Sequence, residues 1–261
     1  MNRRNLLKGM AAASALPAAG LTFGAEKKDG GVSSGPVVVD GLAAGTIRES
    51  YFEGMKKSGV HCVVAGGPRD FDSFTGLLRF FDAHADELVH AKTVADIRRA
   101  HSEGKYANVF CWQEATSLGS AFNEPLGSPT TALRGYHEIG LRIIGLCYNV
   151  TNAFGAGNLE PHIPLTRAGH RLVEEIHGLN MVLDVGGHTG EQTSLDAIAV
   201  APEIPVVCSH TNVAAIADNA RCISDRLIDA IAATGGVIGL SSVSDYHIRS
   251  EGNTGKVRRA T

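Results

Sequence analysis

The stretch of sequence that decides the fold runs from Met181 to Asn212. It reads Met181-Val-Leu-Asp-Val-Gly-Gly-His188, continues through Thr-Gly-Glu-Gln-Thr-Ser-Leu-Asp-Ala-Ile, and closes with Pro205-Val-Val-Cys-Ser-His-Thr-Asn212. Two apolar runs, each followed by a histidine, therefore flank a segment of helical character. If both runs are parallel strands, the two histidines stand at the carboxyl ends of neighbouring strands, which is the edge of an α/β sheet where ligands bind.

These two histidines, His188 and His210, are the first candidates for a functional site. Neutral imidazole is the commonest metal ligand, so a pair at one edge of a sheet predicts a metal site. The alternative is that each histidine is a hydrogen-bonded cap of the helix that follows it. Their spacing alone does not separate the two interpretations.

The rest of the chain repeats the alternation of apolar strand and helix. Further strands are predicted at residues 37–42, 60–65, 108–112, 142–148 and 237–240. Helices are predicted at 48–58, twice within 71–100, before 140, at 166–179 and at 224–233. Continuous apolar strands alternating with helices predict a parallel sheet buried on both faces. We therefore expect an α/β fold of the (β/α)₈ TIM-barrel type, incomplete, with about seven strands and the eighth missing, because the residues after Tyr246 contain no apolar run.

Composition limits the function classes. The 261 residues are 44% hydrophobic and 20% charged with a net charge of −3, which is ordinary for a soluble globular domain and gives no basic patch for nucleic acid. No Gly-x-Gly-x-x-Gly follows the first strand, so a dinucleotide site is not supported. The five cysteines are odd in number and include no Cys-x-x-Cys pair, so we expect no disulfide framework.

The N-terminus has the pattern of an export signal. Arg3-Arg4 and Leu6-Leu7 precede an Ala-rich run that reaches about residue 25, which predicts a twin-arginine signal over residues 1–25 and a periplasmic or secreted protein. The alternative is a disordered basic N-terminus. The run contains Pro17 and is too short for a stable membrane span. Residues 26–36 are predicted to be a linker and residues 37–261 the barrel domain.

Several short motifs, taken together and in order, give the chain a family likeness. It resembles the membrane (renal-type) dipeptidases, zinc-dependent barrel hydrolases of the amidohydrolase superfamily. The matching segments are Leu133–Arg142, Leu165–Gly169, Met181–Asp184, His188–Gly190, Ser209–Asn212, Arg221, Asp225 and Ala232–Gly239. The resemblance implies hydrolysis of a dipeptide by a water that bound metal activates.

Residue by residue, the resemblance assigns His188 and His210 as zinc ligands and Arg221 as the group that binds the substrate carboxylate. A surface salt bridge at a helix cap is the alternative for the arginine. Tyr148 stands where the family has a catalytic histidine, and its phenol can donate a hydrogen bond to a developing oxyanion.

Other positions depart from the family pattern. Leu42-Ala43-Ala44 replaces a His-x-Asp ligand pair, and Gln113 stands in place of the bridging glutamate, with Glu114 one position later. We therefore expect one weakly bound zinc ion rather than two, with Gln113 and Glu114 as further candidate ligands.

Two functional hypotheses follow. The first is a metal-dependent dipeptidase-like hydrolase, divergent and C-terminally truncated, since the chain ends before the family's late aspartate. The second is a catalytically impaired barrel that keeps the fold and binds a small ligand without two-metal hydrolysis. A sugar isomerase barrel is a distant third. The expected partner is a dipeptide, and the sequence leaves a homo-oligomer open.

Overall fold

The main feature of the fold is a curled parallel sheet. The computed structural model describes residues 35–119, 129–217, 219–242, 248–250 and 257–259, with side chains up to residue 242. Its strands follow one another in the order β1 (Val39–Ala43), β2 (Cys62–Gly66), β4 (Tyr106–Trp112), β5 (Leu141–Gly145), β6 (Val182–Asp184), β7 (Val207–Thr211) and β8 (Val237–Leu240). All pairings along this order are parallel.

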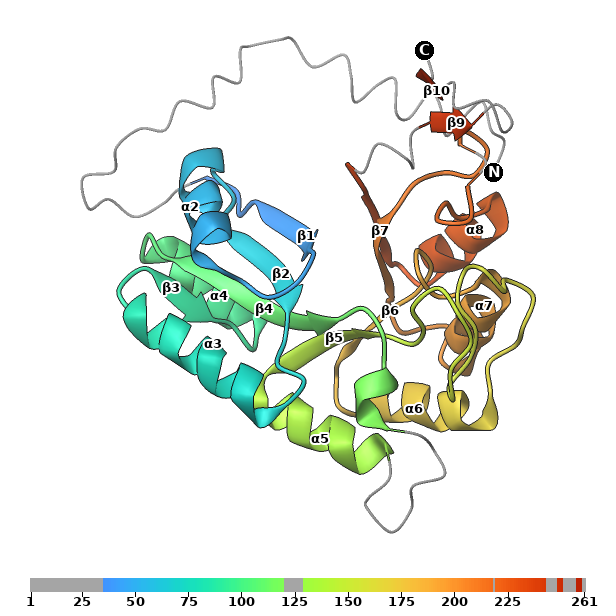
Figure 1. Ribbon diagram of the computed structural model, residues 1–261, viewed down its shortest axis with the longest axis horizontal. Coiled ribbons are helices and arrows are strands. Elements are labelled where there is room, and N and C mark those ends of the chain that lie inside the picture. The colour runs from blue at the N-terminus through green and yellow to red at the C-terminus, as the bar shows by residue number, and fades with distance from the viewer. Residues whose placement is uncertain (1–34, 120–128, 218, 243–247, 251–256, 260–261) are drawn as a thin grey trace.

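Helices connect the strands and lie mainly along the outer side of the sheet (Figure 1). They are α2 (Glu49–Ser58), α3 (Phe71–Ala83), α4 (Val94–Ser102), α5 (Pro129–Ile139), α6 (Arg167–Gly178), α7 (Glu191–Val200) and α8 (Asp225–Ala233), with a short 3₁₀ turn η1 (Thr116–Leu118). Several begin at polar caps that the sequence supplies. Thr166 accepts a hydrogen bond from the Gly169 amide, and Asp70 forms a reciprocal capping box with Ser73.

The core lies on both faces of the sheet, as alternating strand residues require. Val63 and Ala65 of β2 face the larger cluster, which also contains buried side chains of the outer helices. Cys62 and Val64 face a second cluster on the inner face, where Ala100 of α4 packs against them. A strand of a sheet that is covered on both faces is apolar at nearly every position, because its side chains on both faces are buried.

The sheet curls most of the way round without closing. β1 and β8 are the two ends of the strand order. At the middle of both strands, β1 comes close to β7, where a Cβ added to Gly41 would lie 3.8 Å from the carbonyl oxygen of Ser209. The seven-stranded, incomplete TIM-barrel-type fold expected from the sequence is therefore confirmed. β9 (Ile248–Ser250) and β10 (Val257–Arg259) form a separate antiparallel pair.

One strand was not expected from the sequence. β3 (Leu88–His90) pairs with the first half of β4, inside a region that the apolar spacing assigned to two helices. The two helices are present as α3 and α4, but a strand of three residues is too short to produce a readable period of two. The strand predicted over 142–148 is also shorter than expected, since β5 ends at Gly145.

Three expectations concern the termini and the cysteines. The predicted signal over residues 1–25 and most of the linker lie outside the described residues. Among the helices that are described, none combines the length and apolar composition that crossing a bilayer demands. All five cysteines are free, and Cys62, Cys111, Cys147 and Cys208 are buried in the core, so the expectation that there is no disulfide framework is confirmed.

Candidate active site

Two strand ends bring His188 and His210 together. β6 and β7 are hydrogen-bonded neighbours, paired through Asp184 and Val207, and each is followed or ended by one of the histidines. The two imidazole ring centroids lie 4.9 Å apart. The sequence expectation that both histidines occupy one edge of the sheet thus agrees with their position.

A pair of glycines makes this approach possible. Gly186 and Gly187 follow β6 with φ angles of +76° and +62°, a backbone region that residues with a Cβ rarely adopt. A Cβ on Gly187 would stand 2.8 Å from the carbonyl oxygen of His210. The turn between β6 and His188 therefore has to contain glycine for the histidines to meet.

Arg221 joins the two rings. Its Nη2 donates hydrogen bonds of 3.0 Å to Nε2 of His188 and of 3.0 Å to Nε2 of His210. A guanidinium can only donate, so both Nε2 atoms accept and both rings carry their proton on Nδ1. The tautomers of the two histidines thus follow from the contacts they make.

Separate groups hold the Nδ1 side of each ring. Nδ1 of His188 donates to the side-chain oxygen of Asn149 at 2.8 Å. Nδ1 of His210 donates to Oγ of Ser209 at 2.8 Å, and this hydroxyl donates in turn to the carboxylate of Asp184. The Ser209 amide also donates to that carboxylate, at 2.9 Å. Both imidazoles are therefore fixed with their Nε2 lone pairs directed at one point.

Burial and charge keep the histidines neutral. Burial, assisted by the cation of Arg221, lowers the pKa of His188 to about 2 and that of His210 to about 4. Burial raises the pKa of Asp184 to about 6, although the hydrogen bonds from Ser209 act in the opposite direction. A neutral imidazole with a lone pair on Nε2 is the form of histidine that binds metals.

Loop contacts fix the position of Arg221 and of Tyr148. The Arg221 amide donates to the side chain of Asn219, and its carbonyl accepts from Oγ1 of Thr211. The phenol ring of Tyr148 stacks on the ring of His188, with centroids 3.7 Å apart and an interplanar angle of 23°. The structure therefore brings Tyr148, both histidines and Arg221 into one cluster.

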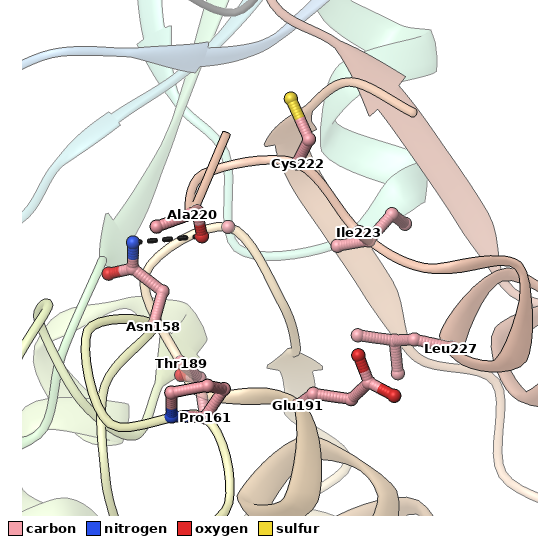
Figure 2. A pocket seen from close by; sticks show the side chains of 9 residues that line it. Asn158, Pro161, Thr189, Glu191, Ala220, Cys222, Ile223 and Leu227 are labelled. Atoms are coloured by element: carbon pink, nitrogen blue, oxygen red, sulfur yellow. Dashed lines mark hydrogen bonds between the residues drawn. The ribbon is translucent and has the colours of Figure 1, made fainter. Parts of the chain in front are cut away.

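A small cavity adjoins this cluster. Its volume is about 210 Å³. Its lining includes Gly187 and Thr189, the sequence neighbours of His188, and Ala220 and Cys222, the sequence neighbours of Arg221. Figure 2 shows that Asn158, another lining residue, lies beside Ala220, and Asn158 donates a hydrogen bond of 2.9 Å to the Ala220 carbonyl. The cavity is thus bounded by residues adjacent in sequence to His188 and Arg221.

The other two candidate ligands lie elsewhere at the strand ends. Gln113 lines a separate cavity of about 280 Å³ together with Arg69 and residues that follow β1 and β2. Glu114 accepts from Arg69 at 2.6 Å and from the Thr116 amide at 2.6 Å. Although burial raises the pKa of Glu114, these hydrogen bonds leave it below its ordinary value. Its carboxylate thus has a structural role in the start of η1.

Sequence reasoning did not single out three residues of the site. Asn149, Asp184 and Ser209 orient the imidazoles from behind. Asp184 ends β6 and Ser209 lies within β7, and that position is the signal that would have found them, whereas Asn149 lies in the loop four residues after β5. Their roles depend on which neighbour each side chain meets, and a linear sequence does not contain that information.

The donor chemistry decides how many ions this cluster fits. The two Nε2 atoms of His188 and His210 suit one divalent ion, since their tautomers leave both lone pairs directed at one point. Within the described residues no group of three His, Cys, Asp or Glu side chains could hold a metal. Among the described residues, this cluster thus offers two imidazole donors, fewer than the pair of bridged ions that the family likeness implies would need.

Comparisons with known proteins agree with this fold. The family description "Membrane dipeptidase (Peptidase family M19)" matches residues 74–257, so the chain belongs to the membrane dipeptidase family. A relative, the dipeptidase tcpJ of Claviceps purpurea (strain 20.1), is 26% identical over 176 residues, which are 66% of this chain and 39% of that protein. The chain thus spans about two fifths of the length of that relative.

Solved structures show the same architecture. An amidohydrolase from Pseudomonas aeruginosa is similar with a TM-score of 0.69 and 25% identity, over 78% of this chain and 62% of that one. A metallo peptidase from Rhodobacter sphaeroides, solved with a phosphinate mimic of the dipeptide L-Ala-D-Ala, has a TM-score of 0.65 and 20% identity, over 81% and 75% of the two chains. The second likeness concerns the fold alone.

Proposed function

We propose that this chain hydrolyses dipeptides at the cluster of His188, His210 and Arg221. The observation that carries the proposal is the convergence of two neutral Nε2 lone pairs and one guanidinium on a single point beside a cavity. Two imidazoles suit a metal, and a guanidinium suits a carboxylate. Membership of a dipeptidase family supports the choice of substrate class.

His188 and His210 would hold one divalent ion, zinc by the family likeness, through Nε2. A bound ion would supply a metal-coordinated water that is acidic enough to yield hydroxide near neutral pH. Two protein ligands are one fewer than catalytic zinc sites usually have, so the ion is expected to bind weakly. Asn149 and Ser209 hold the imidazoles in the tautomer that this requires.

The remaining groups would bind and orient the dipeptide. Arg221 would grip the terminal carboxylate, because its guanidinium lies at the histidine pair and its sequence neighbours Ala220 and Cys222 line the cavity of Figure 2. Tyr148 is 48% exposed and stacked on His188, so its hydroxyl is available to donate to the oxygen of the cleaved amide. The charged side chain in the cavity lining is Glu191.

The direct test is hydrolysis of L-Ala-L-Ala by the full chain supplied with zinc chloride. We expect activity in the wild type, its loss in H188A and H210A, and its retention in H170A. His170 is a suitable control because it lies exposed on α6, away from the cluster. Calorimetric binding of the dipeptide without any hydrolysis would instead support the impaired, ligand-binding barrel.

We also propose export through the twin-arginine route, which the Arg3-Arg4 pair and the Ala-rich run support. Expression of the full chain in a bacterium followed by cell fractionation tests this. The wild type is expected in the periplasm or medium, and a variant with both arginines changed to lysine is expected to stay in the cytoplasm. Equal distribution of the two would contradict the proposal.

A further inference from the structure

One nitrogen atom of Arg221 satisfies both histidines. Nη2 carries two hydrogens, and each is used in a 3.0 Å hydrogen bond, one to Nε2 of His188 and one to Nε2 of His210. Those two lone pairs are the same ones that a metal ion would use. A lone pair that accepts from the guanidinium does not simultaneously bind a metal, so the arginine and the ion compete for one position.

The same hydrogens matter for binding a carboxylate. A guanidinium grips a carboxylate in bidentate fashion with two parallel N–H groups, taken either from Nη1 and Nη2 or from Nε and Nη2. Both of these edges include a hydrogen of Nη2. Because the histidines use both hydrogens, Arg221 has to release at least one ring before it takes up a carboxylate by either edge.

The exchange would be a movement of the Arg221 side chain. Hydrogen bonds to Asn219 and Thr211 hold the main chain of Arg221, so only the side chain needs to rotate. A Cβ added to Gly187 would lie 3.8 Å from Nη1 of Arg221, and Gly187 lines the cavity of about 210 Å³. The guanidinium therefore lies next to a residue that lines this cavity.

We propose that Arg221 is an exchangeable occupant of the metal position, and that a ligand carboxylate draws it off the histidines and so exposes both Nε2 atoms to the ion. This inference rests on the proposed function, because it takes the histidine pair as the metal site. It makes metal and carboxylate binding mutually reinforcing. By linkage, the factor by which the carboxylate raises zinc affinity equals the factor by which zinc raises carboxylate affinity.

The experiment is calorimetric titration of zinc chloride into the metal-free full chain. It is run alone, with N-acetylglycine, and with N-acetylglycinamide, which lacks the carboxylate. Removal of the Arg221 guanidinium from Nε2 of His188 and His210 should raise zinc affinity by about tenfold or more. We expect that rise in the wild type with the acid and not with the amide.

Variants separate the exchange from direct contact between ligand and ion. R221M should bind zinc about tenfold more tightly than the wild type without any ligand, and should not respond to the acid. R226M, which changes an exposed arginine of α8, should behave as the wild type. H188A tests the metal site itself and should lose zinc binding.

The outcomes distinguish the two proposals. Zinc affinity in R221M that equals or falls below that of the wild type overturns the exchange, and so does a response to the acid that persists in R221M. If R221M does not fold, the wild-type comparison of acid with amide decides alone, since equal affinities overturn the exchange. Zinc binding by H188A at wild-type strength overturns the histidine pair as the metal site and thus the proposed function.

Discussion

Asn149 presents its side-chain oxygen to Nδ1 of His188 at 2.8 Å from a left-handed backbone conformation, with φ of +64°. Its amide also donates to the carbonyl of His188, at 3.3 Å. Asparagine is one of the few residues with a Cβ that adopts this conformation readily. Asn149, which follows Tyr148 in sequence, therefore supplies both the turn and the hydrogen-bond acceptor that selects the tautomer of His188.

Replacement of Asn149 separates these two roles. N149G keeps the backbone conformation and removes the acceptor, so zinc affinity should fall by about tenfold, as expected when a partner of a metal-binding histidine is lost. N149D keeps an acceptor and should bind zinc at least as well as the wild type. Calorimetry measures both, and equal zinc affinity in the two variants would show that the hydrogen bond to His188 has no influence.

Gly187 should tolerate no side chain. G187A places a Cβ 2.8 Å from the carbonyl of His210 at a φ of +62°, and we expect destabilisation of about 1–3 kcal/mol for the strained backbone, with the clash in addition. The control is G178A, because Gly178 ends α6 in open space and alanine favours helix by up to about 1 kcal/mol. Urea unfolding that shows the same loss in both variants would contradict the interpretation.

The general architecture was predictable from the sequence because local patterns carry it. Apolar runs such as Val207–Thr211 produce buried strands, and caps such as Thr166 start helices at the expected residues. β3 was missed because three residues give no period, and its pairing with β4 is a tertiary contact. Strand ends, which depend on neighbouring strands, were predicted less closely than strand positions.

The site was predictable only in part. A histidine that follows an apolar run can be recognised from the sequence as a candidate site residue, and the strand order then places His188 near His210. That Arg221 donates to both rings depends on how the loop after β7 folds back, with Val213 bridging Ile223. Glu114 is next to Gln113 in sequence, yet it pairs with Arg69, because the chain turns into η1 at that point.

Acid should destabilise the fold between about pH 6.5 and pH 4. The folded pKa values of His188 and His210, about 2 and 4, lie below their ordinary value of 6.5, so the unfolded chain binds more protons in this window. Asp184 acts in the opposite sense, because its folded pKa of about 6 exceeds its ordinary 3.8. The two histidines together release more protons on folding than the one carboxyl takes up. The free energy of unfolding measured in urea should therefore decrease as the pH is lowered through this window.

The control for this pH dependence is the double variant H188Q/H210Q. Without the histidines, Asp184 is the remaining group of the cluster that titrates between about pH 4 and 6. The slope contributed by the cluster should therefore change sign, and the variant should lose less stability on acidification than the wild type. Identical slopes in the two proteins would mean that the histidines are not held neutral in the fold.

Ser209 should matter most when Asp184 is charged. Its hydroxyl and amide both donate to that buried carboxylate, and S209A removes the hydroxyl. We expect a loss of about 1–3 kcal/mol at pH 7, the usual cost of a lost hydrogen bond to a buried charged group. The loss should shrink at pH 4.5, where the folded carboxyl is protonated. It should also shrink in the D184N background, and additive effects of the two changes would exclude the coupling.

The position of Glu114 in the sequence suggests a metal ligand, whereas its contacts in the structure give it another role. It stands beside the residue that replaces the family's bridging glutamate, but its carboxylate accepts from Arg69 and from the Thr116 amide. E114Q should therefore leave zinc affinity unchanged, while H188A in the same titration loses it. Stability should fall by at most about 1 kcal/mol, since the Arg69 partner is partly exposed and such ion pairs contribute little. A clear drop in zinc affinity for E114Q would return Glu114 to the metal ligands, and it would require η1 to rearrange when the ion binds.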